Sequence, residues 1–531
     1  MNIQETDVLV VGGGGAGMRA ALAAREQGCR VLLVSKTPIG KTTCTYLSGG
    51  MFSVAGKEMS KETHLERTLQ AGKGINSREL VEILTEEAPE RVRELEGFGL
   101  AGQWESERFY CLGKPPAWGA PLAGALAKAC EGQGISLLPW VMIGQLLVQE
   151  GRVVGALGLD FRKGKPIAIQ TRAMILANGG GSALYQRNDN PVRITGDGYA
   201  LAFHAGCHLR DMEFVQFLPT GLAEPGKPPF IMATILCDYG KITNSAGENI
   251  LEKYNITERP VAVRSRDSLS LAIFQEEKEG EKVFLDLRFL SEDDWPQEHM
   301  ALSQRAFLLK HLSCSKKPLP ISPLCHHFMG GVAIDSNGRT DMAGLFAAGE
   351  VSGGVHGANR MGGNALAEIL VFGYRAGASA GRWVKTQEKQ KGLEGCFGQE
   401  LSAFQKKIQQ GGSGPPARDL KKMVGKILWE NAGILREEKG LRLALEGLLQ
   451  MREESLPRVK VQNPKELLEK MEVENALWVG EMIIRSALMR EESRGAHFRK
   501  DFSKSDDQKW KGNIFLQKSA TGMQLGFLPL P

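Results

Sequence analysis

A glycine pattern, GxGxxG at residues 12–17, constrains this chain more than any other feature. It directly follows residues 7–11 (DVLVV), a β-branched run without alternation that predicts a buried parallel strand. Residues 18–27 are rich in Ala and Leu and predict a helix, and residues 30–34 (RVLLV) predict a second strand. Together these elements make the βαβ unit that binds a dinucleotide at the N-terminus of its helix.

Each glycine of the pattern has its own task in such a unit. Gly12 makes the tight turn, Gly14 lets the backbone approach the pyrophosphate, and Gly17 lets helix and strand pack closely. An acidic residue usually ends the second strand and binds the ribose, but Ser35 and Lys36 stand there. The missing acid argues against a plain NAD site. It is compatible with a site in which a side-chain hydroxyl and backbone groups bind the ribose.

Length and charge narrow the class of protein. At roughly 150 residues per domain, 531 residues predict two to four domains. The 66 basic and 61 acidic side chains leave a net charge of +5, too weak a bias for nucleic acid to be the main partner.

The cysteines and the apolar runs indicate the compartment. The nine cysteines form no CxxC pair, which argues against a disulfide framework, a zinc ribbon or an iron–sulfur cluster, and we expect no metal site. A reducing, cytoplasmic location follows from this. The first residues lack the basic region of a signal peptide, and the longest apolar stretch, residues 135–148, is too short at about 14 residues to span a bilayer. We expect a soluble chain without direct membrane insertion, which could still lie on a membrane through a partner.

The remaining patterns predict an α/β protein with an insertion and a helical end. Residues 220–320 lack glycine-rich signatures and are interpreted as an inserted domain, after which residues 344–349 (GLFAAG) restore the pattern of a buried strand followed by glycine. Residues 400–495 have Leu, Glu, Lys and Arg at helical spacing and predict a helical domain. Other predicted elements are a helical stretch over 60–98, short strands over 144–176 and a buried strand at 174–177.

Several strings of residues together resemble one known family. They are GGGGAG at 12–17, SKTPIGKTTCTYLSGG at 35–50, TGDGYALAFHAG at 195–206, DMEFVQFLPTG at 211–221, RSRD at 264–267, HHFMGG at 326–331, GLFAAGEVSGGVHGANRMGGNALAE at 344–368 and SRGAHFRKDF at 493–502. The chain resembles, over nearly its whole length, the flavoprotein family of fumarate reductase and succinate dehydrogenase, which includes L-aspartate oxidase. HGANRMGGN is the most specific of these strings.

The resemblance implies the cofactor and the division into domains. The family binds FAD in a Rossmann-like domain, which an α+β capping domain closes and a helical domain follows. The expected ranges are 1–218 and 331–390 for the FAD-binding domain, 219–330 for the capping domain, 395–495 for the helical domain and 496–531 for a C-terminal strap.

Carried over position by position, the resemblance also implies the residues that contact FAD. They are Gly12, Gly14, Gly15, Ala16, Gly17, Ser35, Lys36, Thr42, Thr43, Gly49, Gly50, Asp197, Glu350, Ala365 and Leu366. Glu350 is placed to bind a ribityl or ribose hydroxyl, and its alternative role is that of a helix N-cap partner. Some members attach FAD covalently through a histidine, but Thr43 stands at that place, so we expect non-covalent FAD. The neighbouring Cys44 is best explained as a small buried side chain.

The family moves a hydride between flavin N5 and a carbon of a C=C or CH–CH bond next to a carboxylate. His326 and Arg360 match its carboxylate-binding residues, and the planar fork of an arginine suits that task. Arg266 matches the residue that donates the proton, although free arginine hardly loses one. The alternatives are a structural salt bridge to Asp267 for Arg266 and a capped core histidine for His326, and we assign no role to His356.

The groups that hold a second carboxylate in the family are missing here. Leu218 replaces a His, and Met232 with Ala233 replaces a Thr-Glu pair at the best-guess register. An unpaired carboxylate buried against such side chains would cost several kcal/mol. One carboxylate clamp is therefore expected to be kept and the other lost.

Three functions follow as alternatives. The first is an FAD-dependent oxidoreductase that acts on a carboxylate substrate, like the flavoprotein subunit of fumarate reductase or succinate dehydrogenase. The second is an enzyme like L-aspartate oxidase, and the third is an electron-transfer flavoprotein subunit with a degenerate active site. Because the chain has no cluster ligands, a separate iron–sulfur partner, oxygen or a quinone must exchange the electrons.

Overall fold

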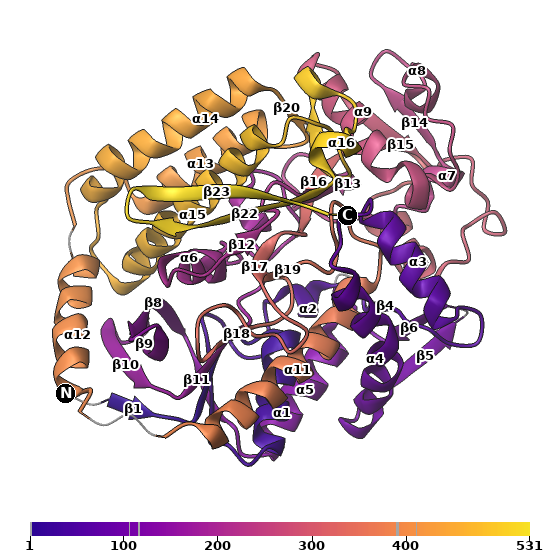
Figure 1. Ribbon diagram of the computed structural model, residues 1–531. Coiled ribbons are helices and arrows are strands. Elements are labelled where there is room, and N and C mark those ends of the chain that lie inside the picture. The colour runs from indigo at the N-terminus through magenta and orange to yellow at the C-terminus, as the bar shows by residue number, and fades with distance from the viewer. Residues whose placement is uncertain (1–2, 106, 115–116, 389–391, 410, 531) are drawn as a thin grey trace.

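A five-stranded parallel sheet lies at the centre of the dinucleotide-binding part (Figure 1). The computed structural model describes residues 3–105, 107–114, 117–388, 392–409 and 411–530. The strand order is β18 (Leu345–Ala347), β11 (Ala173–Leu176), β2 (Val8–Val11), β3 (Val31–Ser35) and β7 (Ser136–Pro139). Every residue of β2, β3 and β11 is buried, as the unbroken apolar runs predict for strands covered on both faces.

Two helices that are far apart in sequence pack together beside this sheet. They are α1 (Gly15–Glu26) and α11 (Asn364–Thr386), with α5 (Ala120–Gly132) next to α1. A Cβ on Gly377 of α11 would lie 2.1 Å from the carbonyl oxygen of Ala20, so only glycine allows this approach. Helix α1 begins at Gly15, three residues before the predicted start, because the glycine turn leads directly into it.

Two smaller sheets flank the central one. The first is β1 (Ile3–Glu5), β10 (Lys165–Gln170), β9 (Arg152–Asp160) and β8 (Val141–Gln149); the second is β4 (Met51–Ser53), β6 (Arg108–Cys111) and β5 (Gly102–Glu105). The helical pattern over 60–98 forms two helices, α3 (Lys61–Ala71) and α4 (Arg78–Gly97), separated by a turn that contains Gly72 and Gly74. This split was not predicted.

The inserted region has its own sheet and its own apolar core. The antiparallel order is β13 (Val215–Leu222), β16 (Leu319–Phe328), β15 (Val283–Asp286) and β14 (Lys241–Asn244). Its helices are α7 (Leu236–Tyr239), α8 (Ile250–Lys253), α9 (Arg266–Lys278) and α10 (His299–His311). The expected boundary between residues 218 and 219 falls inside β13, which begins at Val215.

The C-terminal part is helical, as its periodicity predicts, and ends in a hairpin. Its helices are α12 (Glu394–Gln409), α13 (Ala417–Asn431), α14 (Glu438–Gln450) and α15 (Pro464–Met489). The hairpin of β22 (Gly512–Ser519) and β23 (Gly522–Pro529) joins β12 (Leu209–Arg210), β17 (Gly331–Ala333) and β19 (Ser352–Gly353) in one sheet. The end of the chain is thus part of a sheet and not only a strap, because Asn513 and Ile514 bond to the buried Asp211.

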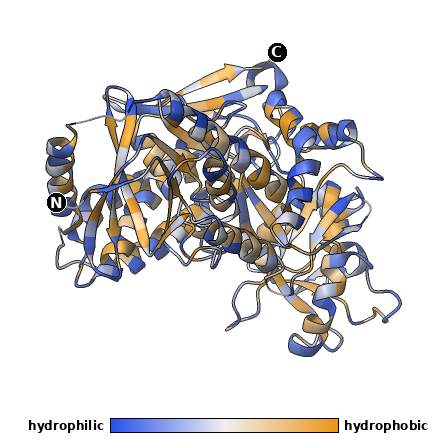
Figure 2. Cartoon of the chain, turned by 90° about the horizontal axis from the view of Figure 1, so that it is seen from below, coloured by the Kyte–Doolittle hydropathy of each residue, from blue (hydrophilic) through white to orange (hydrophobic). Residues whose placement is uncertain are grey.

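Apolar residues gather on the inner strands and on inward helix faces, with polar residues on loops and outer faces (Figure 2). None of the described helices is long and apolar enough to cross a membrane. The remaining short elements are α2 (Cys44–Leu47), α6 (Asp197–His204), α16 (Asp507–Trp510), β20 (Leu435–Arg436) and β21 (Phe498–Arg499).

Candidate active site

A cleft with about 850 Å³ of open space lies at the carboxyl ends of β2 and β3. Most of the residues expected to contact the cofactor line it: Gly12, Gly14, Gly15, Ala16, Ser35, Lys36, Thr42, Thr43, Asp197 and Glu350. The other residues expected to contact the cofactor are not among the described residues that line the cleft. They are Gly17, Gly49, Gly50, Ala365 and Leu366. Gly17 instead packs against the turn, where a Cβ would lie 1.9 Å from the carbonyl oxygen of Gly12.

The cleft fits a dinucleotide at the start of α1. Gly14 is the N-cap and has no side chain, and the Gly15 N–H donates to the Thr45 hydroxyl at 3.0 Å. Residues 12–16 line the cleft, so the N-terminal end of the helix dipole faces it. A Cβ on Gly13 would meet the Ser35 hydroxyl at 2.9 Å, which explains the close turn. The buried Oδ1 of Asn178, also in the cleft wall, has no partner among the described residues and is available to a hydroxyl.

Glu350 stands in the cleft wall as a buried acceptor. Its Oε1 accepts a hydrogen bond from the backbone N–H of Phe328 at 3.0 Å, so it caps no helix and binds strand β16 instead. Burial raises the pKa of Glu350 to about 7, against the lowering effects of the Phe328 hydrogen bond and of Arg360. A carboxyl with this pKa can donate or accept a hydrogen bond near neutral pH.

Lys36 has a structural role that the sequence did not reveal. Its Nζ lies 2.5 Å from Oδ2 of Asp197 and 3.0 Å from Oε1 of Glu472 on α15, and it donates to Thr195. Two residues expected at the cofactor, Lys36 and Asp197, therefore bind each other. Burial alone would raise the pKa of Glu472, but Lys36 and two other cations outweigh it and lower the pKa to about 2.

Thr43 and Cys44 begin the short helix α2 beside the cleft. The Thr43 hydroxyl caps α2 by accepting from the N–H of Tyr46 at 3.1 Å. The Cys44 thiol donates to Oδ1 of Asn190 at 2.9 Å, and burial raises its pKa well above the usual value. A neutral, hydrogen-bonded thiol is a poor nucleophile, although Cys44 is half-buried and not fully buried as expected.

His326 lies in a bulge of strand β16. Gln216 of β13 pairs with His327 and Phe217 pairs with Cys325, so His326 is the extra residue that the ladder leaves out. Such bulges re-aim a side chain next to active sites. Nδ1 of His326 lies 2.7 Å from Oδ2 of Asp189, a contact that fixes the ring and leaves Nε2 for a ligand. Asp189 was missed because it lies in an irregular segment, 137 residues away from His326 in sequence.

Arg266, at the start of α9 in the capping region, lies beside Arg360. Nη2 of Arg360 donates to Oε1 of Gln216 at 2.8 Å, and Nη2 of Arg266 donates to the carbonyl oxygen of Arg360 at 3.2 Å. Burial and the nearby Arg266 lower the pKa of Arg360 to about 10. The Nε atoms of both arginines are buried and have no hydrogen-bond partner among the described residues. A buried and a partly buried guanidinium group with unused donors can together bind an anion.

The expected salt bridge of Arg266 to Asp267 is long. Nε of Arg266 lies 3.9 Å from Oδ1 of Asp267, and the Asp267 side chain is 35% exposed. Asn359 bridges the two residues, because its Nδ2 donates to Asp267 at 2.5 Å while its Oδ1 lies 3.5 Å from Nη2 of Arg266. Asn359 and Gln216 are further polar groups of the site that sequence reasoning missed.

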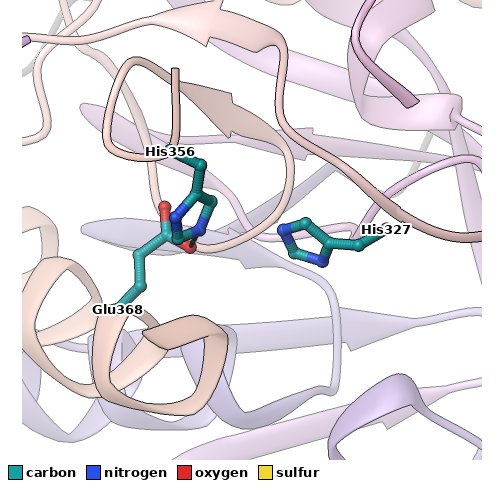
Figure 3. Close-up of side chains that lie close together, drawn as sticks. All are labelled: His327, His356 and Glu368. Atoms are coloured by element: carbon teal, nitrogen blue, oxygen red, sulfur yellow. Dashed lines mark hydrogen bonds and ion pairs between the residues drawn. The ribbon is translucent and has the colours of Figure 1, made fainter. Parts of the chain in front are cut away.

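His327, His356 and Glu368 form a buried cluster next to the site, with His327 turned toward the other two side chains (Figure 3). Their possible ligand atoms lie within 4.8 Å of one another. Nε2 of His356 is 2.9 Å from Oε2 of Glu368, and this contact ties the loop of residues 354–363 to helix α11. Burial and the positive Arg360 hold the pKa of His327 well below its usual value, so its ring is neutral. His356, for which the sequence pattern indicated no role, thus has a structural contact.

The residues that the sequence analysis expects in place of the second clamp are apolar and buried. Leu218 pairs with Leu324 of β16, two residues before His326. Met232 and Ala233 are part of the apolar core of the inserted region. The N–H of Ala233 donates to Oε1 of Gln304 at 2.8 Å, which fixes this segment against α10. None of these three side chains can pair with a carboxylate.

Comparisons with known proteins agree with this architecture. Residues 7–366 match the family described as FAD binding domain, and residues 421–530 match the fumarate reductase flavoprotein C-terminal family. A fumarate reductase (CoM/CoB) subunit from Methanothermobacter marburgensis is 34% identical, with 99% of each chain covered. The fumarate reductase flavoprotein subunit of Escherichia coli is 30% identical, with 94% of this chain and 89% of that protein covered.

Comparison with solved structures supports the same architecture. A variant of E. coli quinol fumarate reductase FrdA superposes with a TM-score of 0.90 at 27% identity, with 100% of this chain and 97% of that chain covered. The predicted fold class is confirmed: α/β, with a Rossmann-like FAD-binding domain, an inserted α+β capping domain and a C-terminal helical domain. FAD is the cofactor that these matches identify.

Proposed function

The chain belongs to the fumarate reductase and succinate dehydrogenase flavoprotein family, and from this premise we propose which substrate its site takes and which residues act. The protein is an FAD-dependent oxidoreductase that acts on a CH–CH or C=C bond. The proposed substrate is an α,β-unsaturated carboxylate, or its saturated counterpart in the reverse direction. Its carboxylate would bind His326 and Arg360, and Arg266 would donate the proton to the carbon that receives no hydride.

One observation carries this proposal: the buried Arg360 and the partly buried Arg266 lie side by side, and each has an Nε–H without a hydrogen-bond partner among the described residues. Two neighbouring guanidinium groups with unused donors favour the binding of an anion between them. Arg360 is fixed by Gln216, and His326 is fixed by Asp189, so both can hold a carboxylate in one orientation. FAD, when bound, supplies or accepts the hydride at N5.

The far end of the substrate is proposed to be uncharged. Leu218, Met232 and Ala233 offer no group that could pair with a second carboxylate. The named relatives are fumarate reductase subunits, so fumarate itself is the competing substrate, held by groups from elsewhere in the chain. An enzyme like L-aspartate oxidase and an electron-transfer subunit with a degenerate site are the remaining alternatives.

A partner is proposed for the electrons. The M. marburgensis relative is named as one subunit of its enzyme, and the scattered cysteines of this chain give no cluster motif. We therefore propose an iron–sulfur subunit that binds this chain and brings it to its cellular location, which is cytoplasmic or at a membrane through that partner. Direct reaction with oxygen or a quinone is the alternative.

A panel of unsaturated acids with a reduced dye tests the function. Purified protein with FAD should oxidise the dye with a monocarboxylic enoate, and Arg360→Gln should abolish this while FAD stays bound. Arg264→Gln is the matched control, because Arg264 is exposed and two residues from Arg266. Hydrogen peroxide formed from L-aspartate would identify an oxidase, and no turnover of any acid would indicate a degenerate site.

A further inference from the structure

The buried cluster of His327, His356 and Glu368 takes no part in the proposed function, and its side chains are all of kinds that bind metal ions. At most 5% of each residue is exposed. The possible ligand atoms lie within 4.8 Å of one another, and Figure 3 shows the His327 ring turned toward the other two side chains. Ligand atoms around one zinc ion, each about 2.0–2.2 Å from it, lie at most roughly 4 Å apart, so a shift of less than about 1 Å brings all three within range.

Two ring nitrogens of this cluster have no hydrogen-bond partner among the described residues. They are Nε2 of His327 and Nδ1 of His356, and both are buried. The other two ring nitrogens face carboxylates: Nδ1 of His327 lies 3.5 Å from Oε1 of Glu350, and Nε2 of His356 lies 2.9 Å from Oε2 of Glu368. Buried polar atoms are nearly always paired, so the two unpaired nitrogens point to a bound species that the described chain does not itself supply.

The protonation and charge of the surroundings favour a cation. Burial and the positive Arg360 hold the pKa of His327 well below its usual value, and a neutral imidazole is the form that binds a metal. A proton on Nδ1 of His327, beside Glu350, leaves the lone pair on Nε2, and such a carboxylate behind a histidine is typical of metal sites. Glu350 and Glu368 can together balance a divalent ion, whereas Arg360 is the single cation that opposes it.

We propose that His327, His356 and Glu368 bind a divalent transition-metal ion of the zinc or ferrous type. Two imidazoles and one carboxylate are ligands that these ions accept readily, with further positions open to water. From the scattered cysteines we expect no metal site, but these three ligands come from separate elements and form no short motif that a sequence could show. The site lies beyond the proposed function, because it requires no particular substrate.

An ion at this place joins the parts of the chain that form the active site. His327 is the neighbour of His326 on β16. His356 lies in the same loop as Arg360, and Glu368 lies near the start of α11, whose first turn is expected at the flavin. The ion would therefore hold the carboxylate-binding residues and the flavin-binding helix in fixed positions, a structural role in which the metal itself undergoes no redox change.

An ordinary hydrogen-bonded pair is the rival explanation. In that case Nε2 of His356 donates to Glu368 and the cluster binds no ion. This explanation accounts for His356 and Glu368, but it gives no partner to Nε2 of His327. The two explanations differ in the metal content of the protein.

The test measures zinc in full-length protein loaded with FAD. The protein is dialysed against EDTA, mixed with an equimolar amount of zinc sulfate, desalted and analysed by atomic emission. Wild type should retain about one zinc ion per chain. His327→Phe and Glu368→Gln should each lower the zinc affinity by about 100-fold or more at normal FAD content. The matched controls are His204→Gln and Cys396→Ser, which change an exposed histidine and an exposed thiol and should leave zinc binding intact.

X-ray absorption at the zinc edge of the wild type identifies the ligands without any substitution. It should show nitrogen and oxygen at about 2.0–2.1 Å with the outer scattering of imidazole, and no sulfur at about 2.3 Å. A wild type that retains essentially no zinc would overturn the proposal, as would a sulfur ligand or zinc that survives both substitutions. If neither variant folds, the wild-type spectrum decides. The panel of acids tests the proposed function separately, so failure of one proposal does not imply failure of the other.

Discussion

The Nζ of Lys36 lies 3.0 Å from Oε1 of Glu472, although 436 residues separate them in the chain. Lys36 follows the second strand of the dinucleotide unit, and Glu472 lies on helix α15 of the helical part. Arg193 and Lys421 bind the same carboxylate. This one buried acid therefore joins the wall of the FAD cleft to the C-terminal helices.

Glu472→Gln should strongly destabilise the protein. The change leaves three cations around a neutral side chain, and loss of one partner of a buried ion pair costs about 3–5 kcal/mol. The pKa of Glu472 is lowered from 4.5 to about 2, so its contribution is present above pH 4.5 and lost as the pH falls toward 2. Urea unfolding at pH 7 and at pH 3 should show the wild type approaching the variant at low pH. Glu474→Gln, which removes a more exposed pair with Lys407, is the control and should change little.

Glu350→Gln should stabilise the FAD-free protein above neutral pH. Burial raises the pKa of Glu350 from 4.5 to about 7, so its contribution is present below pH 4.5 and lost as the pH rises through 7. The difference amounts to about 3 kcal/mol at most. Unfolding of FAD-free protein at pH 5 and pH 8 should show a smaller loss of stability with pH in the variant. Equal losses in both proteins would mean that Glu350 is already ionised in the fold.

FAD should leave the protein on denaturation. Thr43, at the place of the family's covalent histidine, caps α2 and has no ring to attach to the flavin. Acid precipitation should release all the yellow colour into the supernatant. Colour that stays with the pellet after washing would contradict this, and Cys44 would then be the residue to examine.

Arg266→Lys and Arg266→Ala should lower kcat by orders of magnitude at normal FAD content. The guanidinium lies beside Arg360 and Asn359, and lysine cannot reproduce its planar fork. Steady-state rates with an enoate measure this, and the exposed Arg264→Ala serves as control. If a variant has the same kcat as wild type, Arg266 has only a structural role.

Leu218→His should shift preference toward fumarate. An unpaired second carboxylate is penalised by several kcal/mol, whereas an apolar far end gains only about 1–3 kcal/mol per methylene. The values of kcat/KM for fumarate and for a monocarboxylic enoate should show wild type favouring the enoate and the variant favouring it less. A wild-type preference for fumarate of about 100-fold, or 2.7 kcal/mol, would mean that other residues hold the second carboxylate.

The sequence predicted those elements whose structure depends on residues that are neighbours in the chain. The strand at Val8–Val11, the glycine turn and helix α1 follow from residues that are neighbours in sequence. The site residues Arg266, His326 and Arg360 came from resemblance, because nothing in their own surroundings in the sequence marks them. The structure brings Arg266 and Arg360 together, but their roles and the domain bounds remain predictions.

Long-range partners could not be predicted in the same way. Asp189 orients His326, and Gln216 holds Arg360, across 137 and 144 residues of sequence. A bulge is an irregularity in the pairing of two strands. The sequence of β16 alone therefore does not reveal that His326 is the unpaired residue. The ion pair of Lys36 was missed for the same reason, because Glu472 belongs to a helix near the other end of the chain, while its contact with the cofactor remains a prediction.

The edge strand β18 determines when this protein can acquire its cofactor during synthesis. It pairs with β11 only after the capping insertion has been made, and Glu350 and helix α11 come later still. Domains fold from the N-terminus as the chain leaves the ribosome, but a nascent chain of the first 340 residues lacks one edge of its sheet and one wall of its cleft. We therefore expect flavin to bind only after residues 345–350 have been made and have completed the sheet and the cleft.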